Sequence, residues 1–276
     1  MKNKIVFLFV LLFAVFFFIG STNRLEKEII QQTTVQNGSG FLQIGEELIY
    51  EVSYSFIKLG TVRIKTLDKY NKNGRVVFKT IAFIDSYNIP LVSLHNVFES
   101  EIDESVYSHQ FIGSELDGKE WKYTKYDLDY STNKAYMERG YPSRKVIYLK
   151  DSISLDNKKF QDGLSIFFAA RNLLYSQSPV NIPVLINEKK ENAYIKYPCP
   201  SETAEIDAVD YPVDVLKFEG KAGFVGVLGL TGDFRGWFSN DNARIPITAR
   251  MNVILGSVFV ELKSWTRPGW MPPRKP

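Results

Sequence analysis

The stretch YEVSYSF, residues 50–56, points to the fold class because its apolar and polar side chains alternate strictly. A period of two places the apolar and aromatic side chains on one face of a β-strand and the polar ones on the other. The alternation resumes at Val62, Ile64 and Thr66. Residues 57–60 separate the two runs and have the length of a turn, so the pattern predicts a β-hairpin.

Further segments of strand character follow at roughly regular spacing, and a segment rich in proline and acids, residues 196–212, predicts an exposed connection. The strand segments cover residues 76–83, 94–101, 121–130, 134–138, 213–219, 226–238, 245–255 and 257–265. Many short strands with little helix between them favour an antiparallel sheet that is strongly curved or closed. We therefore predict a mainly β protein, built on a large curved antiparallel sheet or open barrel with one buried helix.

That helix is predicted over residues 162–175, where the strand rhythm breaks. Its apolar residues recur at three- and four-residue steps, and Asp162 at its start is a residue type that caps helices. Apolar side chains surround almost the whole helix, which is typical of a buried one. Arg171 lies on it, and an unpaired buried charge is very costly. We therefore expect Arg171 to pair with an acid or to reach the rim of the sheet.

Composition argues against several classes of function. The 276-residue chain carries 34 basic and 31 acidic side chains, a formal net charge of +3, which does not favour a nucleic-acid partner. Its histidines are His95 and His109, and no Cys-x-x-Cys pair is present, so we expect neither a metal nor another cofactor. The single cysteine, Cys199, lies between two prolines, and the fold must depend on packing rather than on a disulfide.

The N-terminus predicts export. Lys2 and Lys4 precede an apolar run that is shorter than the roughly 20 residues needed to span a bilayer, and small polar residues follow it. The predicted location is the periplasm, with membrane contact only through the signal segment; the alternative is an inner-membrane protein tethered by an uncleaved signal anchor. The expected organisation is a signal peptide over 1–20, a flexible lead-in over 21–40, a single β-rich domain over 41–266 and an irregular tail over 267–276.

No motif predicts catalysis. The chain lacks a Gly-x-Ser-x-Gly elbow, and the glycine-rich stretch 223–232 lacks the spacing of a nucleotide-binding loop. Glu99 with Glu101, and Asp127 with Asp129, share strand faces as a two-carboxylate hydrolase would require, but a charged solvent face explains them more simply. We therefore expect a protein that is not an enzyme and assign no catalytic residue.

Aromatic residues indicate what the sheet could bind. Phe167 and Phe168 lie on the predicted helix, Trp121 leads an aromatic-rich strand, and Trp237 begins the closing strands. A curved sheet beside an apolar helix can leave a lined cleft, so these four are the candidate ligand-binding residues for a lipid or a lipoprotein acyl chain. The alternative is a structural or glycan-interacting envelope protein without an internal cavity, in which Trp121 and Tyr123 bind an envelope polysaccharide.

Three motifs, taken in order, resemble one family. FLQIGEELIY (41–50) leads into the first hairpin, QDGLS (161–165) opens the helix, and WFSNDNARIPI (237–247) begins the closing strands, followed by GSV (256–258). Together they resemble the exported bacterial domain-of-unknown-function family number 3108, over about residues 41–265. The resemblance implies an envelope protein of a Gram-negative bacterium, rich in β structure and without an established activity.

The architecture implied by this resemblance looks akin to LolA-type lipoprotein-carrier sheets, which curve around helix to shelter acyl chains. Gly163 and Asn240 depart from the family pattern, where a bulkier residue and an acid are expected. Asp241 and Arg244 follow in a predicted turn, and we expect both to have structural roles.

Overall fold

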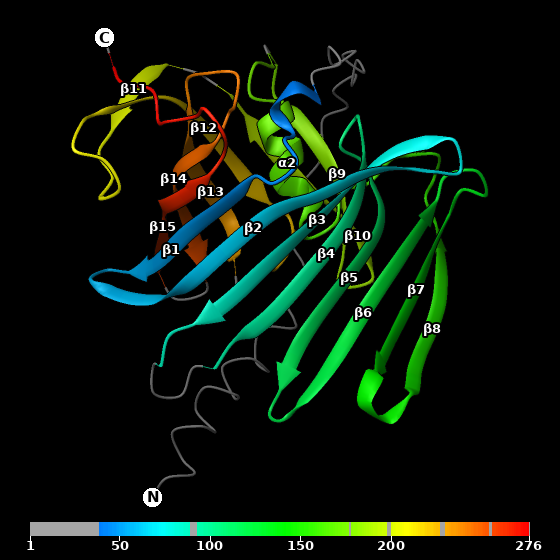
Figure 1. The fold of residues 1–276 in the computed structure, drawn as a ribbon. Helices are drawn as coiled ribbons and strands as arrows, with labels where there is room; N and C mark the ends of the chain where they lie inside the picture. The colour runs from blue at the N-terminus through cyan, green and yellow to red at the C-terminus, as the bar shows by residue number, and fades with distance from the viewer. Residues whose placement is uncertain are drawn as a thin grey trace, which may run out of the picture. The chain divides into compact units, whose positions relative to one another are not determined.

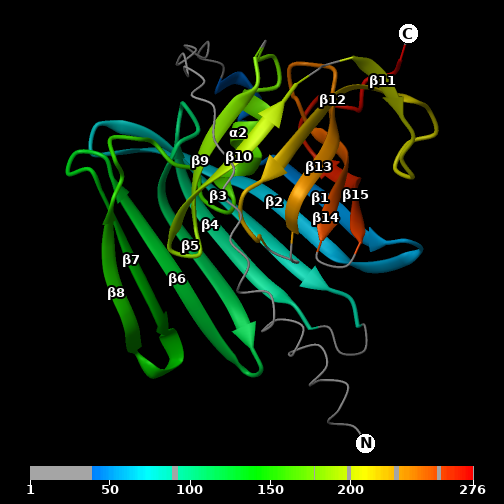
Figure 2. The same cartoon turned by 180° about the vertical axis from the view of Figure 1, so that it is seen from behind.

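The structure is a computed structural model that describes residues 39–88, 93–176, 178–197, 200–226, 230–253 and 256–275. In this part of the chain, one antiparallel sheet of 15 strands curves around one α-helix, α2 (Ser165–Asn172) (Figures 1 and 2). The predicted fold class is thereby confirmed. The predicted signal peptide, the lead-in up to residue 38, and Cys199 lie outside the described residues.

The strands that precede α2 follow one another along the sheet as antiparallel neighbours. After the 3-10 helix η1 (Ser39–Phe41) they are β1 (Glu47–Tyr54), β2 (Ile57–Lys72), β3 (Arg75–Ser86), β4 (His95–Asp103), β5 (Ser108–Asp117), β6 (Glu120–Asp129), β7 (Lys134–Tyr141) and, beyond the 3-10 helix η2 (Pro142–Arg144), β8 (Val146–Ser154).

The strands that follow α2 complete the sheet from the other side. They are β9 (Val180–Ile186), β10 (Lys189–Lys196), β11 (Ser201–Ala204), β12 (Val213–Ala222), β13 (Leu230–Ser239), β14 (Pro246–Val253) and β15 (Ser257–Thr266). The spatial order is β8-β7-β6-β5-β4-β3-β2-β1-β15-β14-β13-β12-β10-β9, and β11 pairs with β12. The last strand therefore lies beside the first, and the β1–β15 ladder joins the two halves of the chain.

Five strands were not predicted, namely β5, β8, β9, β10 and β11. The side chains of β8 are mostly exposed, so no buried face imposes alternation on its sequence. The prediction that residues 196–212 form an exposed connection was wrong, because β11 pairs there with β12 and Ile206 is buried. The first turn is also shorter than predicted: β2 already begins at Ile57, and Ser55 makes the turn with a φ of 54°.

Alternating burial gives the sheet an inner face, directed toward α2, and an outer face. On β1, Leu48, Tyr50 and Val52 are buried, while the residues between them are partly accessible. The inner face continues on the neighbouring strands, because Tyr50 lies opposite Val62 of β2 and Leu262 of β15. Apolar side chains of the inner face and of α2 then form the core.

The helix α2 is shorter than the predicted residues 162–175. Before it, Gln161 is drawn toward the sheet, because its N–H donates to the carbonyl of Pro183 on β9 at 2.9 Å. At its other end the carbonyl of Asn172 accepts a hydrogen bond from Arg244 Nη1 at 3.1 Å. These contacts fix both ends of the helix. Among the described residues, no helix has the length and apolar character required to cross a bilayer.

The sheet has two free ends, β8 and β9, which do not pair with each other. Side chains bridge the gap instead. Glu188, in the turn between β9 and β10, accepts a hydrogen bond from the Tyr126 hydroxyl of β6 at 3.2 Å and forms an ion pair with Arg139 of β7 at 2.7 Å. Arg139 Nε also donates to Thr124 Oγ1 at 3.1 Å. We call this bridged gap, formed by Glu188, Tyr126 and Arg139, the seam.

Candidate functional site on the inner face of the sheet

Two aromatic side chains of α2 lie between the helix and the strands. Phe168 is fully buried and Phe167 is half-buried, and their rings meet edge to face with centroids 5.3 Å apart. Phe167 also makes an edge-to-face contact with the Tyr50 ring on β1, at 6.2 Å. The structure therefore places both predicted helix residues against the inner face.

Half-buried apolar side chains continue from Phe167 across this face. Val62 on β2, Phe98 on β4 and Val260 on β15 share the inner face with Tyr50, as the strand registers show. All of them pack against the core, yet each keeps part of its surface accessible. We call Phe167, Val62, Phe98 and Val260 the inner apolar surface. α2 leaves this part of the inner face incompletely covered.

The two tryptophans predicted to bind ligand lie elsewhere. Trp237 on β13 points to the opposite face from its neighbour Phe238, which belongs to the core beside α2, and its Nε1–H donates to Glu202 at 2.6 Å. Trp121 on β6 is 40% exposed and pairs with Leu116 of β5, on the face opposite Tyr126. The structure thus brings Phe167 and Phe168 together and places Trp121 on the outer face. Trp237 packs against the same core as Phe168, but it lies on the face opposite Phe238.

A buried ion pair holds the C-terminal half of α2. Arg171 donates to both carboxylate oxygens of Glu46, at 2.6 and 3.1 Å, and to the carbonyl of Ala243 at 2.9 Å. Arg171 is 0% exposed and Glu46 2%. Arg267 pairs with the same carboxylate. The expectation that Arg171 pairs with an acid is confirmed, although its partner could not be assigned from the sequence.

A second polar network holds the start of α2. Asp162 Oδ1 accepts hydrogen bonds from the backbone N–H groups of Leu164 and Ser165, both at 2.7 Å, and Oδ2 accepts from the hydroxyls of Ser100 and Ser108. Burial raises the pKa of Asp162, although these hydrogen bonds oppose the shift. The sequence indicated Asp162 as a cap but carried no signal for the two serines, which lie on β4 and β5.

The turn that contains the family motif is structural, as predicted. Asp241 Oδ1 accepts the N–H of Arg244 at 3.1 Å, Oδ2 accepts the Nε1–H of Trp270 at 2.7 Å, and Arg244 adopts a φ of 50°. Asn240 donates from Nδ2 to Asp214 Oδ2 at 2.7 Å. An acid at position 240 would set two carboxylates against each other.

The carboxylates considered for catalysis and the two histidines have neighbours of their own. Glu99 pairs with Lys79 at 3.0 Å and Asp127 with Lys125 at 2.7 Å. The ring nitrogens of His95 and His109 lie 3.0 Å from carboxylate oxygens of Asp85 and Asp103, respectively. In the part of the chain that the structure describes, no three His, Cys, Asp or Glu side chains converge as metal ligands would.

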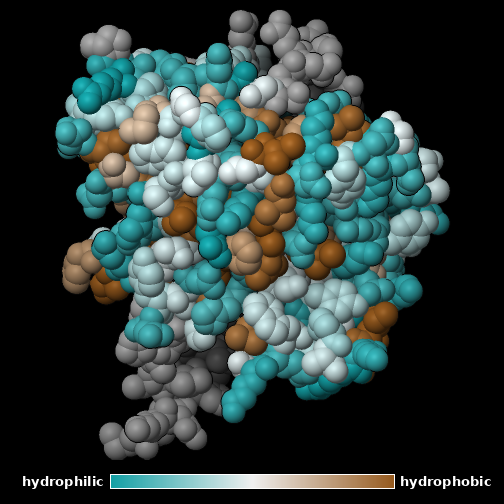
Figure 3. Space-filling model, viewed as in Figure 1, coloured by the Kyte–Doolittle hydropathy of each residue, from teal (hydrophilic) through white to brown (hydrophobic). Residues whose placement is uncertain are grey.

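The outer face also carries apolar side chains. Phe83 on β3 lies opposite Val97 on β4, and Ile81 and Ile112 share this face. Figure 3 shows hydrophobic side chains that gather in a band near the middle of the face in view, with hydrophilic side chains around it. Trp121 and Tyr123 are on the outer face as well, so the glycan-binding alternative concerns a different surface from the inner one.

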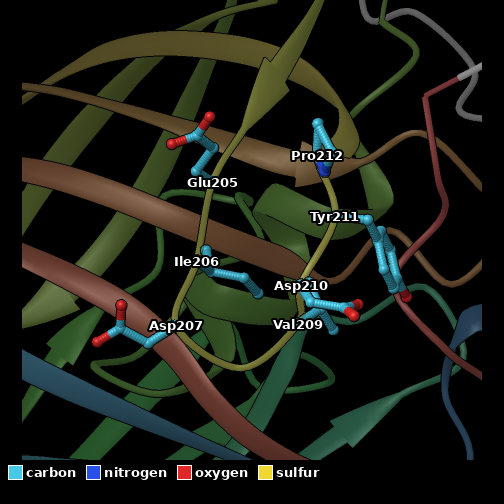
Figure 4. A pocket seen from close by; sticks show the side chains of 7 residues that line it. All are labelled: Glu205, Ile206, Asp207, Val209, Asp210, Tyr211 and Pro212. Carbon is cyan, nitrogen blue, oxygen red and sulfur yellow. The ribbon is translucent and has the colours of Figure 1, made fainter.

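A hollow of about 550 Å³ lies along residues 205–212, between β11 and β12 (Figure 4). Three of its lining residues are acids, Glu205, Asp207 and Asp210, and Figure 4 shows Glu205 and Asp207 directed away from Asp210. Ile206 of the same loop belongs to the core. The hollow is therefore formed by the loop between β11 and β12, and no residue of the inner apolar surface lines it.

Comparisons with known proteins agree with this architecture. The family model described as protein of unknown function, DUF3108, matches residues 49–263. No curated protein matches the chain. A β-barrel-like protein of the domain family DUF1849 from Brucella abortus is similar in structure, with 10% identity, coverage of 81% of this chain and 97% of that one, and a TM-score of 0.51. This likeness shows a shared fold alone.

A second solved structure is more distant. It is a protein from Bacteroides fragilis described as exported, with a YmcC-like fold. Its identity to this chain is 8%, the match covers 82% of this chain and 97% of that one, and the TM-score is 0.34.

Proposed function

The chain belongs to the DUF3108 family of proteins of unknown function, and we propose that it is an exported, non-enzymatic envelope protein whose inner apolar surface binds a lipid or an acyl chain. The observation that carries this proposal is the inner apolar surface, where four apolar side chains inside the curved sheet stay half-buried. Burial of apolar area contributes roughly 25 cal/mol per Å², so a hydrocarbon chain laid over these side chains would be stabilised.

The way α2 is held supports the same function. Asp162 fixes the start of the helix and Arg171 fixes its C-terminal half through buried polar contacts. Because these contacts have directional geometry, α2 is kept at a set position against the sheet. A ligand site for an apolar molecule is usually preformed in this manner, with few polar groups and a largely apolar lining.

Export supports a role in the envelope. The basic residues Lys2 and Lys4 and the apolar run that follows them have the pattern of a signal peptide, and we place the mature protein in the periplasm. Cell fractionation together with the mass of the purified protein tests this placement. Loss of about 20 residues supports a cleaved signal, whereas a full-length chain in the inner-membrane fraction supports the uncleaved anchor.

Binding can be tested with the neutral fluorescent probe N-phenyl-1-naphthylamine on the full chain. We expect its fluorescence to rise on binding and its affinity to fall about fivefold in Phe98→Ser, which puts a hydroxyl on the inner apolar surface. Phe83→Ser is the matched control, because Phe83 is also half-buried but lies on the outer face of the adjacent strand.

Two results would count against the proposal. One is a wild-type protein, shown to be folded by circular dichroism, that takes up no probe. The other is an equal loss of probe affinity in Phe98→Ser and Phe83→Ser, which would mean that the probe does not distinguish the inner face from the outer face.

A second candidate function is glycan binding on the outer face, favoured by the 40% exposure of Trp121 and its position two residues from Tyr123 on the same strand. Aromatic rings stack on the apolar faces of sugars, and the Tyr123 hydroxyl donates to Glu138. Binding to isolated envelope polysaccharide that is lost in Trp121→Ala would support this function. Unchanged binding in that variant, or none in the wild type across a glycan panel, would remove it.

A further inference from the structure

The Tyr50 hydroxyl is a buried polar group without a partner. Tyr50 is 3% exposed, and within the described residues its oxygen makes no hydrogen bond. Buried hydroxyls are nearly always hydrogen-bonded, because an unpaired one forfeits its bonds to water. The Tyr50 ring contacts Phe167, and Tyr50 lies opposite Val62, so this tyrosine borders the inner apolar surface.

A buried ion cluster with more arginine than carboxylate charge lies beside the Phe167 ring that Tyr50 contacts. Two arginines, Arg171 and Arg267, share the single carboxylate of Glu46. A third, Arg244, stacks on Tyr175 with 4.8 Å to the ring centroid, and its Nε has no hydrogen-bond partner in the described part of the chain. Burial raises the pKa of Tyr50; the charge of Arg171 opposes this shift and the charge of Glu46 adds to it, so both members of the ion pair act on the hydroxyl. Because two arginines share the one carboxylate of Glu46, an anionic group beside Tyr50 would be favoured.

We propose that the ligand is an anionic amphiphile, a long-chain carboxylate in its simplest form, whose head accepts a hydrogen bond from the Tyr50 hydroxyl while its chain follows the inner apolar surface. This inference rests on the proposed function and adds the chemical class of the ligand. The Tyr50 hydroxyl donates the hydrogen bond and an anionic oxygen of the ligand head accepts it. Arg171 and Arg267, which share the one carboxylate of Glu46, favour this negative charge. The hydrocarbon chain covers Phe167, Val62, Phe98 and Val260.

The test is displacement of bound N-phenyl-1-naphthylamine by oleate, measured on the full chain as wild type, Tyr50→Phe and Tyr70→Phe. Tyr50→Phe removes only the hydroxyl oxygen. Tyr70→Phe is the matched control, because the Tyr70 hydroxyl donates to Glu101, away from the inner apolar surface. We expect oleate to bind Tyr50→Phe about tenfold more weakly than wild type, because a hydrogen bond to a charged group is lost. The probe itself should bind all three proteins alike.

Two further ligands identify the chemical class of the ligand's head group. Oleoyl lysophosphatidic acid carries a phosphate on the same chain, and 1-oleoylglycerol carries an uncharged head. If the Tyr50→Phe loss is larger for lysophosphatidic acid than for oleate, a phospholipid is the source of the ligand, and the reverse indicates a free fatty acid. A loss of the same size for 1-oleoylglycerol would overturn the requirement for an anionic head.

The remaining outcomes separate the two proposals. If the probe binds but Tyr50→Phe keeps the wild-type oleate affinity within about twofold, this inference fails and the proposed function stands. If neither probe nor oleate binds folded wild-type protein, the proposed function fails and this inference fails with it. Thermal unfolding tests whether Tyr50→Phe is as stable as wild type. Removal of an unpaired buried hydroxyl should leave the melting temperature unchanged or raise it.

Discussion

Arg171 is the largest of the fully buried side chains in the described part of the chain, and its charge is matched by a carboxylate 125 positions earlier in the sequence. Replacement by methionine, which keeps much of its volume, would leave Glu46 buried with Arg267 as its one remaining cation. We expect Arg171→Met to lower the free energy of unfolding by about 3–5 kcal/mol, measured by urea denaturation.

The triple variant Glu46→Gln, Arg171→Met, Arg267→Met is the control for that experiment. It removes all three charges of the cluster, so it should recover at least half of the stability lost in the single variant. A single variant within about 1 kcal/mol of wild type would show that the pair does not hold α2.

At the same scale, Asp162 makes stability depend on pH. Burial raises its pKa above the ordinary 3.8, so the protonated form is the one that favours the folded chain. Its stabilising contribution is complete below 3.8 and is lost as the pH rises through the raised pKa. Asparagine cannot ionise and keeps an oxygen acceptor for the N–H groups of Leu164 and Ser165.

The stability of wild type relative to Asp162→Asn should therefore fall as the pH rises from about 4 toward neutrality. Urea denaturation of both proteins across this range measures the difference. A difference that does not change with pH would show that the carboxyl group has the same pKa in the folded and unfolded chain.

At the scale of elements, β12 and β13 interlock through glycine and phenylalanine. Gly236 lies opposite Phe218, and Gly220 lies opposite Phe234. A β-carbon at Gly236 would overlap the Phe218 ring, so the aromatic ring occupies the space that a side chain would need. We expect Gly236→Val to lower the free energy of unfolding by about 1–3 kcal/mol through overpacking, as measured by chemical denaturation.

Gly163→Ala serves as the comparison for that variant. Its added methyl group would meet Phe111 at 3.7 Å, an ordinary contact, so its stability should stay close to wild type. Equal losses in the two variants would assign the effect to backbone freedom rather than to the Phe218 ring.

An element could be predicted from the sequence only where its residues carry a local pattern. The alternation at residues 50–56 and the three- and four-residue steps at 162–175 are local patterns, and both elements are present. Tyr50 and Val52 are buried as the alternation predicts, whereas Tyr54 and Phe56 are exposed. β8 could not be found in this way, because it lies at an end of the sheet with mostly exposed side chains. The buried pair of Arg171 with Glu46 joins distant parts of the chain, so no local pattern contains it.

The candidate site shows the same limit at the scale of the whole molecule. Phe167 and Phe168 are neighbours in sequence and remain neighbours in space, whereas Val62, Phe98 and Val260 are brought to the inner face only by strand register. Trp121 has the residue type of a ligand-binding group, but the parity of its strand places it on the outer face. The residue types of the chain indicated an apolar site, but only the strand registers determine which residues line it.

The seam is the place where this molecule can open, because no backbone ladder joins β8 to β9. The Glu188–Arg139 pair is partly exposed and contributes little alone, but Tyr126 is buried and its hydroxyl donates to the same carboxylate. We expect Glu188→Ala to lower the free energy of unfolding by only about 1–2 kcal/mol. Amide hydrogen exchange in β9 and β10 should nevertheless speed up about fivefold, while β1–β3 exchange as before.

Glu47→Ala is the matched control for the seam. Glu47 is as exposed as Glu188 and pairs with Lys65 at 3.0 Å, but β1 and β2 are also joined by a backbone ladder. Its loss should therefore leave exchange in β1 and β2 nearly unchanged, because the ladder still protects those amides. If Glu188→Ala leaves exchange in β9 and β10 at the wild-type rate, the side chains of the seam do not hold the ends of the sheet together. Packing of β9 and β10 on α2 would then be sufficient to keep them in place.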